Sequence, residues 1–461
     1  MKISKIKKIN EKIPDWVKLP FGNLIRHQLI SNSVFVEQYR RLESMTMKST
    51  EDKIEILKQC LVNAYTHTTY YRNLFNRIGF NPEEFSDFKQ IERIPILTKE
   101  VLQREYLNIA ADNIDNYYEV TTGGTSGKPT KVLMDKDAIY REWAFVYHYW
   151  SEYGYDYKVS RLATLRGVDF NGKKYKYNPL YAEIRLNPFL MGESTIVDYI
   201  KKIKSFHADF LYGYPSAVYN FCRLCLEKNI DIQEQFKAVF LISENLYPYQ
   251  ENVITAVTQA PIAMFYGHSE RAVFAEKKEG TEYIFNAQYG YTEIGENNEI
   301  IATGFINHKM PLIRYLVDDV AMPMNDGTYK ILGHHTSEVL YGKEGIQISM
   351  AALNFHDDSF DGVEAYQFVQ NTIGKCELHI VGEPLNGISV LAKRVQLKLG
   401  ENIECRVIQK KQIEYTKRGK YKMVIQNCKI CRGGAKLNYS YNNQKYSQSF
   451  TELRTIIKKV A

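Results

Sequence analysis

The sequence lacks any apolar run approaching twenty residues, and its first eight residues carry charge throughout. A membrane-spanning helix needs about 20 consecutive apolar residues, and a secretory leader needs an apolar stretch behind a basic start. With neither pattern, we expect a cytoplasmic protein with no membrane span. Internal repeats and low-complexity tracts are also missing, and 44% apolar with 25% charged residues is typical of a soluble globular protein.

Cysteine is scarce, with seven in 461 residues, and an odd number without a leader argues against a disulfide framework. Two pairs, Cys222/Cys225 and Cys428/Cys431, have the C-x-x-C spacing found in zinc sites. The first pair shares one helical face with Val218, so we interpret these thiols as small core residues. A zinc site is the less favoured alternative, because the two pairs are far apart in sequence.

Basic residues are not gathered into arms, and the net charge of +7 is spread along the chain. Such dispersed charge favours small anionic ligands such as nucleotides or coenzyme A and gives no indication of nucleic-acid binding. We interpret one local basic segment as a solvated face, with phosphate contact as the alternative. Its members are Arg161, Arg166, Lys173, Lys174 and Lys176.

Hydroxyl groups and glycines are concentrated at 120–132, which read Val-Thr-Thr-Gly-Gly-Thr-Ser-Gly-Lys-Pro-Thr-Lys-Val. Glycines allow backbone N–H groups to approach an anion, and Lys128 adds a positive charge. A Walker loop is excluded, because Thr122 replaces its first glycine and a strand-like segment follows instead of a helix. We predict a different phosphate-binding loop between two strands, with a polar hairpin as the alternative. Its candidate ligands are Thr122, Gly124, Thr125, Ser126, Gly127 and Lys128.

Strand-like and helix-like segments alternate after residue 209, which predicts a parallel sheet covered by helices. The expected strands are 210–212, 238–242 and 261–265. Ligands bind such sheets outside the carboxyl ends of the strands. The polar residues that follow these strands are therefore candidates for a site: Gly213 and Tyr214, Ser243 and Glu244, and Tyr266-Gly267-His268-Ser269-Glu270.

The remaining pattern divides the chain into a large and a small part. Residues 1–50 are expected to be helical, helices are predicted at 51–66 and 137–150, and alternating strands at 299–303 and 312–316 predict an antiparallel meander. A shift in composition near 333–338 marks the boundary, so the expected domains are 1–335 and 336–461. The small α+β domain should contain helices 348–355 and 388–399, strands 364–370, 376–381, 403–410 and 421–426, and a terminal helix after Thr451.

Taken in order, these stretches resemble phenylacetate–CoA ligase and its CapK-like relatives, within the adenylate-forming superfamily of acyl-CoA synthetases and adenylation domains. The resemblance extends from about residue 121 to 424. It is carried by the loop 122–129, Gly-Tyr-Pro-Ser at 213–216, Ser-Glu at 243–244, Tyr-Gly-His-Ser-Glu at 266–270, Pro-Leu-Ile-Arg-Tyr at 311–315 with Asp319, and Gly-Lys at 419–420.

The resemblance implies an α/β adenylate-forming fold, with an N-terminal domain that binds ATP and an acid and a mobile α+β lid that carries the catalytic lysine. It further implies an ATP- and Mg²⁺-dependent, AMP-forming ligase. Such an enzyme converts a carboxylic acid to acyl-AMP and passes the acyl group to an acceptor, most simply coenzyme A, and relatives occur in capsule and polysaccharide gene clusters.

The resemblance also implies roles for individual residues. Tyr266 and Gly267 would lie beside the adenine, Ser269 at the α-phosphate and Glu270 on the metal. Three further groups complete the implied site: Ser243, Glu244, Asp319 and His334 around the nucleoside; Lys420 as the catalytic lysine, acting with Ser269 and Glu270; and His268, Gly213 and Tyr214 along the substrate pocket.

Three features depart from the family pattern. Ser269 replaces a threonine and keeps the hydroxyl, and the residues around the catalytic lysine read Thr416-Lys-Arg-Gly-Lys420 instead of Thr-x-Ser-Gly-Lys, which does little harm. His334 stands where the family has a hinge arginine, which weakens a ribose contact. Three alternatives therefore stay open: acyl transfer to an amino group of a sugar or sugar-nucleotide, transfer of AMP to a hydroxyl, and a catalytically silent nucleotide-binding protein. The acid and the oligomeric state are not indicated.

We predict that Lys420→Ala nearly abolishes adenylation and leaves ATP binding intact. The lysine would offset the negative charge that accumulates as a carboxylate attacks the α-phosphate, so it acts in the transition state rather than in docking. Pyrophosphate exchange measures the first property and calorimetry the second. ATP binding with no turnover, unaffected by the substitution, would indicate the silent protein instead.

Overall fold

The computed structural model describes residues 22–44, 50–121, 130–166, 170, 172–244, 246, 248–278, 280–332, 339–353, 358–414 and 423–428. Some predicted features lie outside these residues and stay predictions. They are the phosphate loop (Thr122, Gly124, Thr125, Ser126, Gly127 and Lys128), His334 with the domain boundary at 335/336, Lys420, Cys431 and the helix after Thr451.

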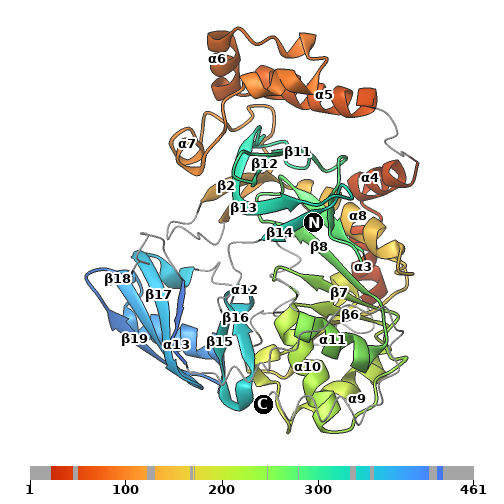
Figure 1. Ribbon diagram of the computed structural model, residues 1–461, viewed down its shortest axis with the longest axis vertical. Helices are drawn as coiled ribbons and strands as arrows, with labels where there is room; N and C mark the ends of the chain where they lie inside the picture. Colours follow the sequence, from red (N-terminus) through yellow and green to blue (C-terminus); the bar gives the residue numbers. More distant parts are fainter. Residues whose placement is uncertain are drawn as a thin grey trace.

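A single mixed sheet of twelve strands forms the centre of the described chain (Figure 1). Its parallel part runs β8-β7-β6-β3-β5, and the remaining strands pair antiparallel. The predicted parallel sheet and the predicted meander are thus confirmed, and they are joined in one sheet where β8 pairs with β9. In spatial order the strands are β11 (Gly290–Ile294), β12 (Glu299–Gly304), β13 (Tyr315–Pro323), β14 (Tyr329–Leu332), β10 (Tyr283–Phe285), β9 (Phe274–Lys277), β8 (Ile262–Gly267), β7 (Ala238–Ile242), β6 (Phe210–Gly213), β3 (Leu162–Leu165), β5 (Glu183–Leu186) and β4 (Tyr175–Asn178).

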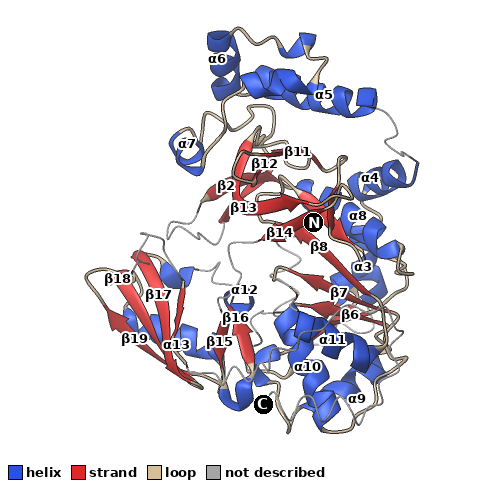
Figure 2. Ribbon diagram, viewed as in Figure 1, coloured by secondary structure: helices blue, strands red, loops and turns tan. Residues whose placement is uncertain are grey.

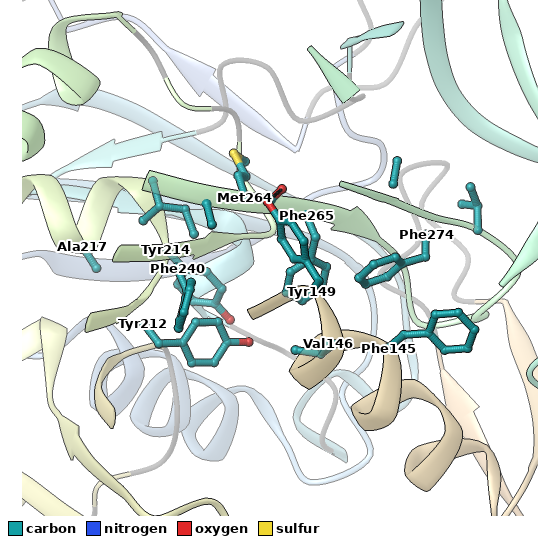
Figure 3. Close-up of a cluster of buried hydrophobic side chains, with 14 of the residues drawn as sticks. Phe145, Val146, Tyr149, Tyr212, Tyr214, Ala217, Phe240, Met264, Phe265 and Phe274 are labelled. Carbon is teal, nitrogen blue, oxygen red and sulfur yellow. Dashed lines mark hydrogen bonds between the residues drawn. The ribbon is translucent and has the colours of Figure 1, made fainter. Parts of the chain in front are cut away.

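The predicted helix at 137–150 is α8 (Ala138–Ser151), whose aromatic residues recur at helical spacing and are buried. Trp150 stacks on Phe240 of β7 with ring centroids 4.3 Å apart, and the Tyr149 hydroxyl donates to the Met264 carbonyl of β8 at 3.1 Å. Figure 3 shows Phe145 of α8 near Phe274 of β9, and their ring centroids are 6.3 Å apart. The helix therefore packs along both parts of the sheet.

Helix α10 (Pro215–Glu227) follows β6 directly and begins with a proline, which suits the first turn of a helix. Cys222 and Cys225 are both buried in it, so the prediction that they are core residues is confirmed. Burial raises the pKa of both thiols, that of Cys225 to about 12. Among the described residues no cluster of three or more His, Cys, Asp or Glu side chains is arranged to hold a metal ion.

Figure 2 shows helices covering the parallel strands, and the described N-terminal residues are themselves largely helical. The described part of the chain contains no helix with the length and apolar character needed to cross a membrane. The predicted helix at 51–66 is confirmed, and so is helical structure between residues 22 and 44. Besides α8 and α10, the helices described before residue 333 are α3 (Gly22–Ile30), α4 (Ser33–Ser44), α5 (Thr50–His67), α6 (Thr69–Ile78), α7 (Lys99–Arg104), α9 (Ile196–Phe206) and α11 (Pro248–Thr258).

A two-stranded hairpin carries the predicted phosphate loop. Strands β1 (Tyr117–Thr121) and β2 (Lys131–Asp135) pair antiparallel, with Thr121 opposite Lys131, and form a sheet separate from the large one. The hairpin is fastened to the main body through Asn307, whose side chain accepts from the Asp135 N–H at 3.1 Å and donates to the Leu133 carbonyl at 2.8 Å. The expected position of the loop, between two strands, is confirmed.

The C-terminal part forms two small sheets, one pairing β15 (Val339–Tyr341) with β16 (Gln347–Ser349) and the other ordered β19-β18-β17-β20. It meets the N-terminal part where Asn402 donates to the Phe189 carbonyl at 2.6 Å and Asn220 donates to the Gln347 carbonyl at 3.1 Å. The predicted α+β character is confirmed. The other elements are α12 (Met350–Leu353), β17 (Val363–Thr372), β18 (Lys375–Gly382), α13 (Ile388–Leu399), β19 (Glu404–Gln409) and β20 (Val424–Gln426).

Two predicted elements are wrong in their bounds. The segment 348–355 is not one helix, because 347–349 pairs with 339–341 and only the short α12 follows. The strand predicted at 312–316 begins instead at Tyr315, because Arg314 has a left-handed backbone with φ of 50° that interrupts an extended chain.

We predict that Gly213→Ala at the end of β6 destabilises the protein by about 1–3 kcal/mol. A Cβ atom at this position would lie 2.5 Å from the Leu165 carbonyl oxygen of the neighbouring strand, so the two backbones must separate. Urea unfolding measures the loss. Gly267→Ala at the end of β8 is the control, because its Cβ meets no atom closer than 3.5 Å; equal losses in the two variants would contradict this explanation.

Candidate active site

The parallel strands bring most of the predicted residues to the carboxyl ends of the strands, which together form one side of the sheet, called the carboxyl edge below. Leu165 pairs with Gly213, Gly213 with Leu241, and Ile242 with Phe265, so β3, β6 and β7 end nearly level, and β8 continues beyond them to Gly267. The residues after these strands are neighbours, because adjacent strands lie about 4.8 Å apart. This edge holds Arg166 after β3, Tyr214 after β6, Ser243 and Glu244 after β7, and His268, Ser269 and Glu270 after β8.

Tyr266 and Asp319 form one direct contact of the site. Tyr266 lies at the end of β8, and its hydroxyl donates to Asp319 Oδ2 of β13 at 2.6 Å. Burial, together with the negative charge of Asp319, raises the pKa of Tyr266 well above its ordinary value, so the phenol stays protonated and remains a donor. The two residues that the resemblance places around the nucleoside are thus in contact.

Glu270 is a carboxylate buried within the edge, with only 7% of its surface exposed. It accepts a hydrogen bond from the Tyr315 hydroxyl at 3.2 Å, and its Oε2 lies 3.0 Å from Nδ1 of His268. Burial acts to raise the pKa, but the contact with His268 and the charge of Lys99 outweigh it and lower the pKa of Glu270 to about 2. The site therefore contains a negative charge that is largely removed from water.

Glu244 couples two of the loops. Its carboxylate accepts from the Ser216 N–H at 3.0 Å and from the Ser216 hydroxyl at 3.1 Å, so it caps the start of α10. A carboxylate is favourable there, because the N-terminus of a helix carries unsatisfied N–H groups and a partial positive charge. The preceding residue, Ser243, has a left-handed backbone with φ of 68° that turns the chain toward this contact.

The residues expected along the substrate pocket are brought to the same edge. Gly213 and Tyr214 are buried and directly precede α10, and His268 is half-buried beside Glu270. Ser269 is exposed, so its hydroxyl is accessible to a ligand. The individual roles assigned to these residues stay predictions.

Arg271 is a residue of the site that the motif comparison missed. Its Nε donates to Glu142 Oε2 of α8 at 2.8 Å, and its Nη1 donates to the Tyr118 hydroxyl of β1 at 3.2 Å. One guanidinium therefore connects the loop after β8 with α8 and with the hairpin that carries the phosphate loop. Its place directly after Glu270 was the only signal in the sequence.

Arg166 was misassigned to a solvated face. The structure turns it inward: its guanidinium carbon lies 5.1 Å from the centre of the Tyr212 ring and 5.7 Å from that of Tyr214, and its Nη1 donates to the Tyr212 hydroxyl at 2.9 Å. Arg161 and Lys174 of the same basic segment do follow the prediction, since both are exposed. Arg166 differs because it follows the buried strand β3.

A magnesium ion is compatible with this geometry. Mg²⁺ is usually held by one or two carboxylates together with phosphate oxygens and water, so it does not need a cage built from the protein alone. Glu270 supplies an ionised carboxylate at the edge where a phosphate would lie.

Comparisons with known proteins agree with the fold. No protein-family model matches the sequence. A crystal structure of 2-hydroxyisobutyryl-CoA ligase, in complex with 2-HIB-AMP and CoA in the thioesterification state, superposes with a TM-score of 0.54 at 16% identity, covering 85% of this chain and 93% of that one. The fold is thus that of the adenylate-forming ligases, and the predicted fold class is confirmed.

Within this class the predicted likeness to CapK is also confirmed. Protein CapK of Staphylococcus aureus is 24% identical over 419 residues, a match that covers 82% of this chain and 92% of that protein. The similarity therefore extends over nearly all of the relative and is not confined to one motif.

We predict that the pH dependence of stability distinguishes Glu270 from surface carboxylates. A folded-state pKa of about 2, below the ordinary 4.5, contributes stability that is fully present above pH 4.5 and is lost as the pH falls toward 2. Between pH 6 and pH 3 the wild type should therefore lose more unfolding free energy than Glu270→Gln, by up to about 2 kcal/mol.

Urea unfolding with a chelator present measures this difference without a contribution from bound metal. Glu251→Gln is the control, because Glu251 is exposed on α11. This variant should follow the wild-type pH profile. A Glu270→Gln profile parallel to that of the wild type would show that Glu270 is not held as a buried anion.

Proposed function

We propose that this protein is an ATP-dependent, AMP-forming ligase that adenylates a carboxylic acid and transfers the acyl group to coenzyme A. The observation that carries the proposal is the set of side chains at the carboxyl edge of the sheet, where the ionised Glu270 lies beside Ser269 and the hydrogen-bonded Tyr266–Asp319 pair. The likeness to a ligase crystallised with an acyl-AMP and CoA supports the same class of reaction.

The edge is suited to a nucleotide because it offers complementary groups in a short span. Asp319 is a hydrogen-bond acceptor of the kind that binds ribose hydroxyls, and the exposed Ser269 hydroxyl is a donor for a phosphate oxygen. Tyr266 provides an aromatic ring next to Asp319. This arrangement supports a nucleoside monophosphate lying along the end of β8, with its phosphate at Ser269.

Glu270 would hold Mg²⁺, which when bound neutralises phosphate charge and orients the leaving pyrophosphate. His268 and Tyr315 keep the carboxylate in place through the contacts described above. Arg271 would hold the loop after β8 against the hairpin, so that the phosphate loop at 122–129 faces Ser269. The hydroxyls of that loop and Lys128 would bind the β- and γ-phosphates.

The proposal also includes a division of the chain at 335/336, with Lys420 in the C-terminal part, which acts as a lid. A lid that brings Lys420 to the reacting carboxylate would lower the repulsion between that carboxylate and the α-phosphate. The likeness to CapK makes a role in capsule or polysaccharide synthesis part of the proposal. The acceptor is then either coenzyme A or an amino group of a sugar or sugar-nucleotide, and the products decide between them.

We predict acid-dependent exchange of pyrophosphate into ATP for at least one member of a panel of aliphatic, aromatic and amino acids. Lys420→Ala should reduce that exchange by at least about 100-fold, as the loss of a preorganised transition-state charge does. Lys410→Ala, an exposed lysine in the same part of the chain, is the matched control and should retain exchange.

Mass spectrometry of the product then identifies the acceptor. An acyl-CoA supports the leading proposal, an acylated amino sugar the second, and a product heavier by an adenylyl group the transfer of AMP to a hydroxyl. ATP binding by calorimetry with no exchange for any acid would contradict an adenylating enzyme.

A further inference from the structure

Arg166 has no carboxylate partner among the described residues, although it is half-buried at the edge of the sheet. Its hydrogen-bond partners there are the neutral phenols of Tyr212 and Tyr214, whose rings also lie beside the guanidinium. Glu183 lies near enough to interact with it electrostatically. That carboxylate, however, is already bonded to the side chains of Thr164, Asn178 and Arg185 at 2.6–2.7 Å.

A half-buried charge without a counter-ion is unfavourable, because the protein replaces only part of its hydration. A guanidinium also has five N–H donors in a planar fork, which matches the two oxygens of a carboxylate. The Tyr212 and Tyr214 rings and the Tyr212 hydroxyl fix the position of Arg166 while leaving donors of its fork for a ligand. Arg166 is thus preorganised for an anion.

The position of Arg166 indicates which anion. Its guanidinium lies over the ring of Tyr212 in β6, and β8 is the second strand from β6, so at a strand spacing of about 4.8 Å it is at least roughly 10 Å from the loop that contains Ser269. This distance is too long for one group to contact both places. It fits an acid that has its reacting carboxylate near Ser269 and a second anionic group near β6.

We propose that Arg166 selects the acid, and that the substrate is a dicarboxylic acid whose two carboxylates are separated by a short chain or a single aromatic ring. One carboxylate is adenylated at the end of β8, and the other forms a two-point ion pair with Arg166. This inference rests on the proposed adenylating function and specifies its substrate class. Arg166 is a binding residue that sets specificity and takes no part in the chemical step.

The test uses pairs of acids that differ in one charge: glutarate with its monomethyl ester, and 4-carboxyphenylacetate with 4-methylphenylacetate. In pyrophosphate exchange with the wild type, KM should be at least about 10-fold lower for the dicarboxylate of a pair, as expected for a bidentate charged contact. Arg166→Met should remove this preference by raising KM for the dicarboxylate, with KM for the monocarboxylate partner changed less than about 3-fold.

Arg161→Met is the matched control, because Arg161 is an exposed arginine at the start of the same strand that donates to the Phe206 carbonyl. It should leave both values unchanged. If Arg166→Met does not fold, as judged by circular dichroism, Arg166→Lys replaces it: this variant keeps the charge without the fork and should raise KM for the dicarboxylate several-fold.

Failure of this inference is distinguishable from failure of the proposed function. Exchange with the monocarboxylates that equals or exceeds exchange with the dicarboxylates overturns the inference alone, as does an equal effect of Arg166→Met on both members of a pair. If no acid supports exchange, the proposed function fails. Calorimetric binding of 4-carboxyphenylacetate in the presence of AMP then decides the inference, which requires binding to the wild type and none to Arg166→Met.

Discussion

The buried negative charge of Glu270 is the constraint on which the rest of the site depends. A carboxylate with 7% of its surface exposed is stable only if nearby groups replace the water it has lost. His268 comes from its own loop, Tyr315 from β13, and the charge of Lys99 from α7. Two distant parts of the chain, β13 and α7, must therefore be folded against this loop before the charge is tolerated.

The loops at the edge are positioned by side chains and not only by the strands that precede them. Glu244 connects the end of β7 to the start of α10, and Arg271 connects the loop after β8 to α8 and β1. Each link is a charge-assisted hydrogen bond, which is stronger and more directional than a neutral one. Hydrogen bonds thus connect the loops that carry the sequence motifs to neighbouring elements, so a shift in the position of one loop also moves the elements bonded to it.

Much of this arrangement was predictable because it depends on local patterns. Buried strands such as 238–242 and the helices at 137–150 and 388–399 follow from apolar periodicity, and the candidate loops follow from the rule that ligands meet the carboxyl ends of parallel strands. The orientation of Arg166 was not predictable, because it depends on Tyr212 of β6 and on Tyr214, which directly follows that strand. The left-handed turn at Arg314 was missed for a similar reason: its guanidinium is held by Glu293, about twenty residues away.

The continuity of the central sheet has a consequence for attempts to divide this protein. Because β8 pairs with β7 on one side and β9 on the other, the parallel and antiparallel parts have no natural seam between them. A fragment ending near residue 261 would leave β7, a strand of five mostly buried apolar residues, as an open edge. Unprotected apolar edges recruit strands from other chains, so such fragments would aggregate, and shortened forms should keep β6 through β14 intact.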